Sequence, residues 1–280
     1  MKLLVTGASG MLGRAVVDAA TRLGHEVLGP THAELDITDA EATRRAVAAA
    51  RPGAVVNCAA YTDVDGAETD RQGAEAVNVQ GARNIAAAAA HIGAFIVHLS
   101  TDYVFDGSKR EPWLESDVVG PLGVYGETKL AGERAVASAN PAHAIVRTAW
   151  LFGAGGRNFV DTMLALGAQR DEVAVVTDQV GCPTWTGHLA GVLVELAERP
   201  GERGIHHIAG SGSCSWNELA LEIFRRSGID CRVLPATSEQ FVRPAKRPAY
   251  SVLGTQRPDC LVLPPWQAGV AEYLATRVAA

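Results

Sequence analysis

Short apolar runs alternate with helical runs along the first half of the chain. The strand-like apolar runs cover residues 2–6, 26–29, 54–60, 95–101 and 144–148. Apolar side chains recur every three or four positions, the helical period, in residues 14–23, 40–50, 74–92 and 126–138. Strands that alternate with helices of this length predict a parallel sheet with helices on both faces.

The pattern loosens after residue 150. It predicts helices over 158–169, 186–198, 215–227 and 268–278, and strands over 173–177 and 204–209. Ser215 with Glu218 three positions later forms a capping-box signature. We therefore expect a Rossmann-type doubly wound α/β sheet in residues 1–150, with elements near 186–209 returning to it. A smaller, interleaved substrate lobe is expected in residues 151–280.

Glycines stand where the first predicted strand turns into the first predicted helix. They are Gly7, Gly10 and Gly13, and Met11 and Leu12 lie between the last two. Glycine allows a tight turn, a close backbone approach to a pyrophosphate and close packing of helix on strand, and the helix N-terminus attracts phosphate. The pattern predicts dinucleotide binding, and its alternative is a turn that serves packing alone.

Tyr125 and Lys129 are four positions apart in a predicted helix, so they share one of its faces. A nearby ammonium favours the phenolate, and we expect Lys129 to lower the pKa of Tyr125. Such pairs also arise by chance on surface helices. Thr101 ends a central strand, where a hydroxyl serves as a cap or binds a substrate carbonyl. Together with the glycine turn, the three residues predict nicotinamide-dependent hydride transfer at a carbonyl or alcohol.

Composition narrows the function classes. The chain has 280 residues and a formal net charge of -6, which offers no basic surface for nucleic acid. Neither a signal-peptide pattern nor an apolar run long enough to span a membrane is present. The odd count of 5 cysteines fits neither a disulfide framework nor a zinc site. We expect reduced cysteines that serve packing, and a cytoplasmic protein.

Several strings carry a family resemblance. The glycine turn, Ser-Thr-Asp-Tyr-Val-Phe-Asp-Gly at 100–107 and Tyr-Gly-Glu-Thr-Lys at 125–129 resemble the extended short-chain dehydrogenase/reductase superfamily. Within it, the chain resembles the dTDP-4-dehydrorhamnose reductase family from residue 2 nearly to its end. The strings that carry this closer resemblance lie at 56–65, 147–153, 178–184 and 247–253.

The resemblance implies roles for individual residues. Tyr125 would donate a proton to the sugar C4 oxygen, Lys129 would bind the nicotinamide ribose and favour the phenolate, and Thr101 would share the hydrogen bonding. NADPH, or NADH, would be bound by Gly7, Gly10, Met11, Leu12, Gly13, Asp36, Ile37, Ala59, Ala60, Tyr61 and Thr62, with Tyr125 and Lys129. Thr101, Asp102 and Trp150 would contact the substrate. Core packing is the competing interpretation for Trp150, and a helix start before Thr38 is the one for Asp36 and Ile37.

Two departures from the family pattern matter. The second predicted strand ends without an Asp or Glu to bind a ribose 2′-hydroxyl, which favours NADPH or tolerance of both cofactors. The first helix opens at Arg14 without the glutamate that bridges magnesium between subunits in some members, so we assign no metal.

The resulting hypothesis is reduction of dTDP-4-dehydro-L-rhamnose by an NAD(P)H-dependent enzyme that yields dTDP-L-rhamnose. The partner is then a dTDP-linked 4-keto-6-deoxyhexose, and the enzyme is a monomer or homodimer. The alternatives are a 4-ketoreductase for another nucleotide-deoxysugar in an antibiotic pathway, a nucleotide-sugar epimerase, and a non-catalytic relative that kept the fold.

Overall fold

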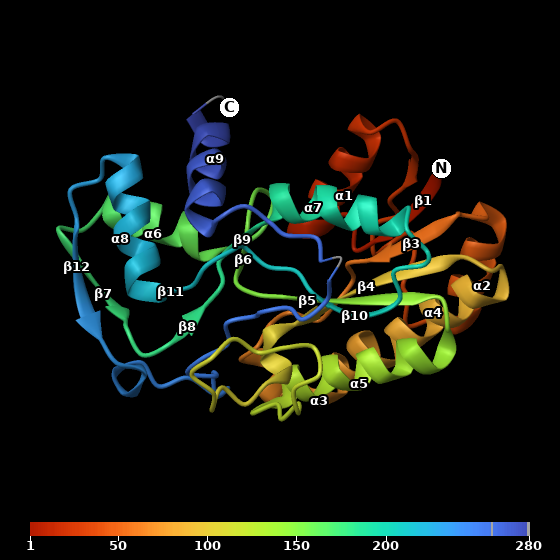
Figure 1. Ribbon diagram of the computed structural model, residues 1–280, viewed down its shortest axis with the longest axis horizontal. Helices are drawn as coiled ribbons and strands as arrows, with labels where there is room; N and C mark the ends of the chain where they lie inside the picture. The colour runs from red at the N-terminus through yellow and green to blue at the C-terminus, as the bar shows by residue number, and fades with distance from the viewer. Residues whose placement is uncertain (259, 279–280) are drawn as a thin grey trace.

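A six-stranded parallel sheet forms the centre of the computed structural model, which describes residues 1–258 and 260–278. Its strand order is β10-β5-β4-β3-β1-β2 (Figure 1). The strands are β1 (Lys2–Thr6), β2 (Glu26–Leu28), β3 (Ala54–Asn57), β4 (Phe95–Thr101), β5 (His143–Thr148) and β10 (Gly204–His207). The predicted doubly wound α/β fold is confirmed.

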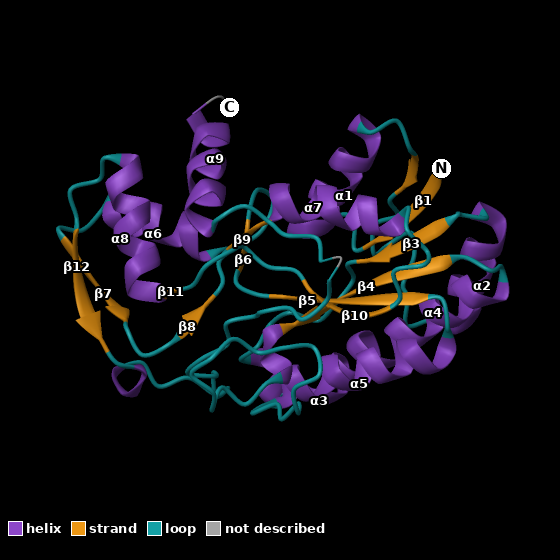
Figure 2. Ribbon diagram, in the orientation of Figure 1, coloured by secondary structure: helices purple, strands orange, loops and turns teal. Residues whose placement is uncertain are grey.

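Helices cover both faces of this sheet (Figure 2). One face carries α1 (Met11–Arg22) and α7 (Thr186–Ala197), and the other carries α2 (Ala40–Ala50), α4 (Ala82–His91) and α5 (Val124–Ala139). In β1, Leu3 and Val5 enter the first core and Leu4 enters the second. A strand buried on both faces needs apolar residues at every position, which is why β1 shows no alternation.

A third hydrophobic core lies beside the sheet, towards the left of Figure 1. It gathers α6 (Phe159–Gly167), α8 (Trp216–Ser227) and α9 (Trp266–Val278). Three two-stranded pairings complete this part: β7 (Glu172–Val176) with β12 (Arg232–Ala236), β6 (Leu151–Phe152) with β9 (Thr184–Trp185), and β8 (Val180–Gly181) with β11 (Cys214–Ser215). The predicted capping box at Ser215 is confirmed. The apolar pattern did not predict β12, which contains Pro235 and pairs with one strand only.

The predicted helix over 74–92 is interrupted. It consists of α3 (Arg71–Glu75), a π-helix (Ala76–Gly81) and α4. In the π-helix, Asn78 accepts from the backbone N–H of Tyr61 at 2.9 Å and donates to the Tyr61 carbonyl at 3.2 Å. A Cβ on Gly132 of α5 would lie 2.1 Å from the Asn78 carbonyl oxygen. The glycine therefore lets α5 pack directly on this bulge, a tertiary contact that the apolar period of 74–92 does not encode.

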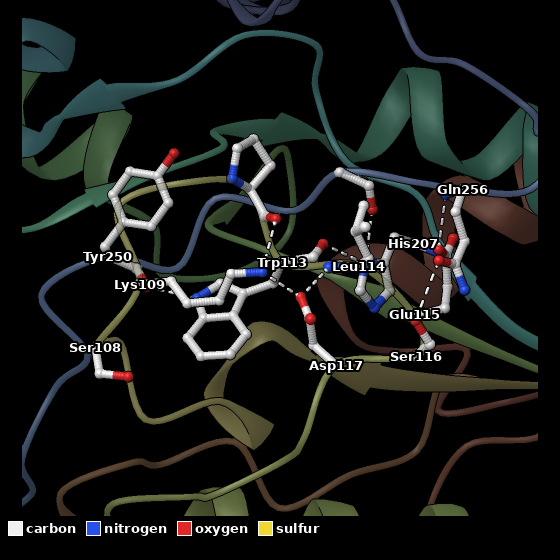
Figure 3. A network of polar contacts seen from close by, with 12 residues as sticks. Ser108, Lys109, Trp113, Leu114, Glu115, Ser116, Asp117, His207, Tyr250 and Gln256 are labelled. Atoms are coloured by element: carbon white, nitrogen blue, oxygen red, sulfur yellow. Dashed lines mark hydrogen bonds and ion pairs between the residues drawn. The ribbon is translucent and has the colours of Figure 1, made fainter.

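His207 of β10 joins two distant segments at the edge of the sheet (Figure 3). Its Nδ1–H points at the carbonyl oxygens of Trp113, at 3.0 Å, and Gly254, at 2.8 Å. Burial is the main cause that lowers the pKa of His207, so the ring is neutral. The loop 108–117 and the segment 250–257 are thereby fixed against β10. No helix in the described part of the chain is long and apolar enough to cross a bilayer.

Candidate active site

A cavity of about 880 Å³ opens at the carboxyl ends of β1, β3, β4 and β5. In open parallel sheets, ligands bind outside the carboxyl ends of the strands. Every residue that the sequence assigned to catalysis, cofactor or substrate lines it: Gly7, Gly10, Met11, Leu12, Gly13, Asp36, Ile37, Ala59, Ala60, Tyr61, Thr62, Thr101, Asp102, Tyr125, Lys129 and Trp150. The fold therefore brings the whole predicted set together, and the role of each residue stays a prediction.

The glycine turn forms one end of the cavity. Gly7 has φ +67, a left-handed conformation that side chains rarely adopt, and a Cβ there would lie 2.6 Å from the Ala59 nitrogen. A Cβ on Gly13 would lie 2.1 Å from the Gly7 carbonyl oxygen. Gly10 caps α1 and offers no side chain to the first N–H groups of the helix, and the first residues of α1, Met11, Leu12 and Gly13, line the cavity. This cradle fits the pyrophosphate of a dinucleotide.

Asp36 and Ile37 had two interpretations in the sequence, cofactor binding or a helix start before Thr38. The N-cap of α2 is Asp39, which accepts from the Ala42 N–H at 2.9 Å. Asp36 instead accepts from the N–H and the hydroxyl of Thr38, at 2.9 and 2.8 Å. Asp36 is therefore not the helix cap, and it lines the cavity together with Ile37.

Helix α5 brings Tyr125 and Lys129 to the cavity. Its first N–H, at Val124, donates to the Glu68 carboxylate at 2.9 Å. A Cβ on Gly126 would lie 2.3 Å from the Tyr103 carbonyl oxygen, so only glycine lets the first turn pack this closely. The Tyr125 ring then meets the Tyr103 ring edge-to-face, with centroids 5.6 Å apart.

The pKa of Tyr125 departs from the sequence prediction. Burial raises it to about 12, against the opposing effect of a hydrogen bond with Thr101, and the negative charge of Asp102 adds to the rise. The prediction that Lys129 lowers this pKa is wrong in the free protein. The Lys129 ammonium donates instead to the Leu99 carbonyl at 2.6 Å, and Lys129 is not among the groups that shift the pKa of Tyr125.

Lys129 itself is 2% exposed. Burial lowers its pKa to about 8, while the charge of Glu133 opposes the fall. The amine therefore remains mostly protonated at neutral pH.

Two buried polar groups at neighbouring strand ends complete the inner wall. Burial raises the pKa of Asp102 to about 6, although hydrogen bonds from Ser251 and Thr101 act in the opposite direction. The Thr101 hydroxyl donates to Asp102 Oδ1 at 3.0 Å. Within the described residues, Asp102 Oδ2 and the Thr148 hydroxyl have no hydrogen-bond partner. Both side chains line the cavity and so can bind a ligand. Thr148 was not among the site residues predicted from the sequence.

Trp150 follows β5 in a left-handed conformation, φ 47. Its ring stacks on that of Trp216, with centroids 3.5 Å apart and an interplanar angle of 3°. A Cβ on Gly181 would lie 2.4 Å from the Trp150 ring, so this glycine makes room for it. Trp150 thus packs against other side chains and also lines the cavity, as both interpretations of the sequence require.

Comparison with known proteins places this geometry in a family. The model of the RmlD substrate binding domain matches residues 1–278. The chain belongs to the RmlD family. It is 49% identical to the dTDP-4-dehydrorhamnose reductase of Streptomyces griseus over 96% of this chain and 91% of that protein. The resemblance seen in the sequence is therefore confirmed.

Two further proteins are similar to this chain. One, from Streptomyces antibioticus, is named "Probable dTDP-4,6-dihydroxy-2-methyloxan-3-one 4-ketoreductase"; it is 47% identical over 92% of this chain and 88% of that protein. The other is the crystal structure of dTDP-4-dehydrorhamnose reductase from Bacillus anthracis in complex with NADP. It is 37% identical, with a TM-score of 0.95 over 98% of this chain and 99% of that chain.

This RmlD-family chain has a second cavity, of about 740 Å³, which was not predicted from the sequence. Tyr103 and Trp216 line both cavities, so the two adjoin. Its basic side chains come from the stretch 243–247: Arg243, Lys246 and Arg247. The cluster of Arg, Lys and Pro at 243–248 lies within the predicted substrate lobe, but no role was predicted for its individual residues.

Arg247 ties this basic stretch to the sheet. It donates two hydrogen bonds to the Asp65 carboxylate, at 3.0 and 2.8 Å. Asp65 also accepts from the Ala245 N–H at 3.2 Å, and the contact with Arg247 is the main cause that lowers its pKa. Two segments about 180 positions apart are thereby joined beside the site.

Proposed function

We propose that this protein is an NAD(P)H-dependent oxidoreductase that reduces the C4 keto group of dTDP-4-dehydro-L-rhamnose to give dTDP-L-rhamnose. The observation that carries the proposal is that one cavity gathers the glycine cradle, Thr101, Tyr125 and Lys129. Membership of the RmlD family, and the name of the Streptomyces griseus relative, support the substrate.

The residues divide the chemistry between them. The N–H groups of α1 and the glycine turn would hold the dinucleotide pyrophosphate, and the dinucleotide supplies the hydride when bound. Tyr125 keeps its proton at neutral pH because its pKa is raised to about 12, so it enters the reaction as an acid. It donates that proton to the C4 oxygen.

Thr101 and Lys129 support the proton donor. The Thr101 hydroxyl, at the end of β4, would share the hydrogen bonding of the alkoxide that develops on the substrate. The Lys129 ammonium adds positive charge beside the reacting oxygen, and it lies close enough to the cavity to bind the nicotinamide ribose.

The nucleotide end of the substrate would occupy the second cavity. Two phosphates carry negative charge, and Arg243, Lys246 and Arg247 offer positive charge to them. Tyr103 and Trp216 line both cavities, so an extended nucleotide sugar can reach from the basic stretch to Tyr125. This supports a nucleotide-linked sugar rather than a free sugar as the substrate.

A second candidate function changes only the sugar. The Streptomyces antibioticus relative, 47% identical, carries the name of a 4-ketoreductase with another dTDP-linked substrate. Consumption of NADPH by the purified protein with dTDP-4-keto-L-rhamnose, and with dTDP-4-keto-D-hexoses, separates the two. Lack of NADPH oxidation with the L-sugar refutes the first candidate.

Tyr125→Phe tests the assigned acid. The variant loses the donor hydroxyl but keeps the ring that packs on Tyr103. We expect turnover to fall by about 10²-fold or more, the usual contribution of a general acid, with the Kd for NADPH within about twofold of the wild type. Wild-type turnover by the variant would show that another group delivers the proton.

A further inference from the structure

A buried charged network lies directly behind Lys129. Glu133 is one turn further along α5 and is 3% exposed, and Arg147 of β5 is 2% exposed. Arg147 donates to both oxygens of Glu133, at 2.9 and 2.7 Å, and the Ser100 hydroxyl of β4 donates to the same carboxylate. Ser100 and Arg147 face each other in the β4–β5 pairing. One carboxylate of a helix thus binds two adjacent strands.

This network fixes α5 relative to the edge of the sheet. Tyr125, Lys129 and Glu133 are spaced by four positions and share one face of the helix. Lys129 holds the carbonyl of Leu99, and Glu133 holds the side chain of Ser100, the next residue of β4. The two contacts set both the rotation and the axial position of α5, and therefore the place where Tyr125 reaches the cavity.

Arg147 is in turn held from its other side. Its guanidinium lies 5.2 Å from the centroid of the Phe105 ring, and its Nη1 lies 3.4 Å from Nε2 of His207. Because Nδ1 of His207 carries the proton that faces two carbonyl groups, Nε2 is free to accept from Arg147. Arg147, the ion-pair partner of Glu133, is therefore in contact with His207, which anchors the loop 108–117.

Among the charged groups near Lys129, Glu133 has the largest electrostatic effect on its amine. The titratable and charged groups around the amine come from each element packed against it: Tyr125 and Glu133 on α5, His98 on β4, Arg147 on β5, Cys58 after β3, and Asp102 after β4. Burial lowers the pKa of His98 well below its ordinary value and raises that of Cys58 to about 12, so both are uncharged at neutral pH. Glu133 is the carboxylate whose charge acts most on Lys129.

We propose that Glu133 is a positioning residue for Lys129: held by Arg147 and Ser100, it sets the placement of α5 and keeps the Lys129 amine in its ammonium form. This inference rests on the proposed function, because it assigns a residue that supports the proton-transfer group of that reaction. Glu133 does not line the cavity and acts through Lys129.

Glu133→Gln is the central test, because the amide keeps the shape of the side chain and removes its charge. The titration of Lys129 is measured by competitive labelling with acetic anhydride and peptide mass spectrometry, with Lys2, Lys109 and Lys246 as internal references. Loss of a neighbouring opposite charge lowers the pKa of an amine by about one unit or more. We expect Lys129 to titrate at least one pH unit lower in the variant, and the alkaline limb of the pH–turnover profile to move with it.

Glu127→Gln is the matched control. Glu127 is also on α5 but is about half exposed and pairs with Arg71 at the surface. Its replacement should leave the titration of Lys129 and the pH–turnover profile unchanged. If Glu133 served only the stability of the fold, Glu133→Gln would change the thermal stability and leave the Lys129 titration and the pH–turnover profile unchanged.

A second variant covers the case in which Glu133→Gln does not fold. Replacing Glu133 by Gln and Arg147 by Met together removes both buried charges, and paired removal is tolerated far better than removal of one partner. The Lys129 titration should still lie below that of the wild type. If Lys129 titrates as in the wild type in either folded variant, the inference is wrong. Labelling does not depend on turnover, so a shifted titration with no keto-sugar reduction in the wild type refutes the proposed function alone.

Discussion

The proposed catalytic amine should destabilise the free protein, and replacing it should reveal by how much. Lys129 is 2% exposed, and its pKa is about 8 against an ordinary 10.5. Lys129→Met keeps an unbranched side chain, one heavy atom shorter, and removes the charge. We expect a more stable protein at neutral pH that has lost its reductase activity.

The magnitude follows from the two pKa values. At 1.36 kcal/mol for each pKa unit, the change from 10.5 to about 8 means that the buried ammonium costs about 3 kcal/mol. The variant also loses the hydrogen bond to Leu99, worth about 1 kcal/mol. The free energy of unfolding of Lys129→Met should therefore exceed that of the wild type by about 2 kcal/mol at pH 7.

The pH dependence gives the prediction its sign. The folded pKa of Lys129 is depressed, so between about pH 8 and 10.5 the unfolded state binds more protons than the folded state. Rising pH therefore stabilises the wild type between about pH 8 and 10.5. Below about pH 8, the buried ammonium destabilises the folded state by its full amount. At pH 9.5 about 2 kcal/mol of the cost has disappeared, so the variant and the wild type should be nearly equally stable.

Urea unfolding of both proteins without cofactor, at pH 7 and pH 9.5, measures these differences. Lys2→Met, at a lysine whose side chain is 33% exposed, serves as the control and should change the free energy of unfolding little at either pH. A Lys129→Met protein that is less stable than the wild type at pH 7, or whose advantage does not shrink by pH 9.5, would refute the reasoning.

Three further predictions concern the walls of the two cavities. Gly13→Ala places a Cβ 2.1 Å from the Gly7 carbonyl oxygen, so the turn must shift. We expect the variant to lose NADPH affinity by about tenfold or more in a fluorescence titration. An affinity close to that of the wild type would refute the role of the glycine cradle. Arg247→Gln should break the double hydrogen bond to Asp65 and raise the KM for the nucleotide sugar more than it lowers kcat, and an unchanged KM contradicts the assignment of the second cavity. Asp102→Asn should stabilise the protein at pH 7.5 but not at pH 4. The pKa of Asp102 is raised to about 6, so its carboxylate destabilises the fold only as pH rises above about 4. Urea unfolding at the two pH values checks this difference.

The sequence alone was enough to predict the parallel sheet and the chemistry of its edge. Strand β1 has apolar residues at three consecutive buried positions, Leu3, Leu4 and Val5, because both of its faces are buried. Gly13 is likewise a local requirement, since a Cβ there would lie 2.1 Å from the Gly7 carbonyl oxygen, and Gly7 has φ +67, a backbone conformation that favours glycine. Local sterics and burial are properties of short stretches, so short stretches reveal them.

Only the tertiary structure decided how distant segments complete the site. Arg247 reaches Asp65 across about 180 positions, and the basic stretch around it forms the second cavity. The period of 74–92 predicted one helix, but contact with Gly132 accompanies a π-helix around Asn78. The raised pKa of Tyr125 depends on burial by many elements together, whereas its spacing from Lys129 suggested the opposite direction. Local residue types thus determined which groups are available, and long-range packing determined their charge, their partners and the shape of the site.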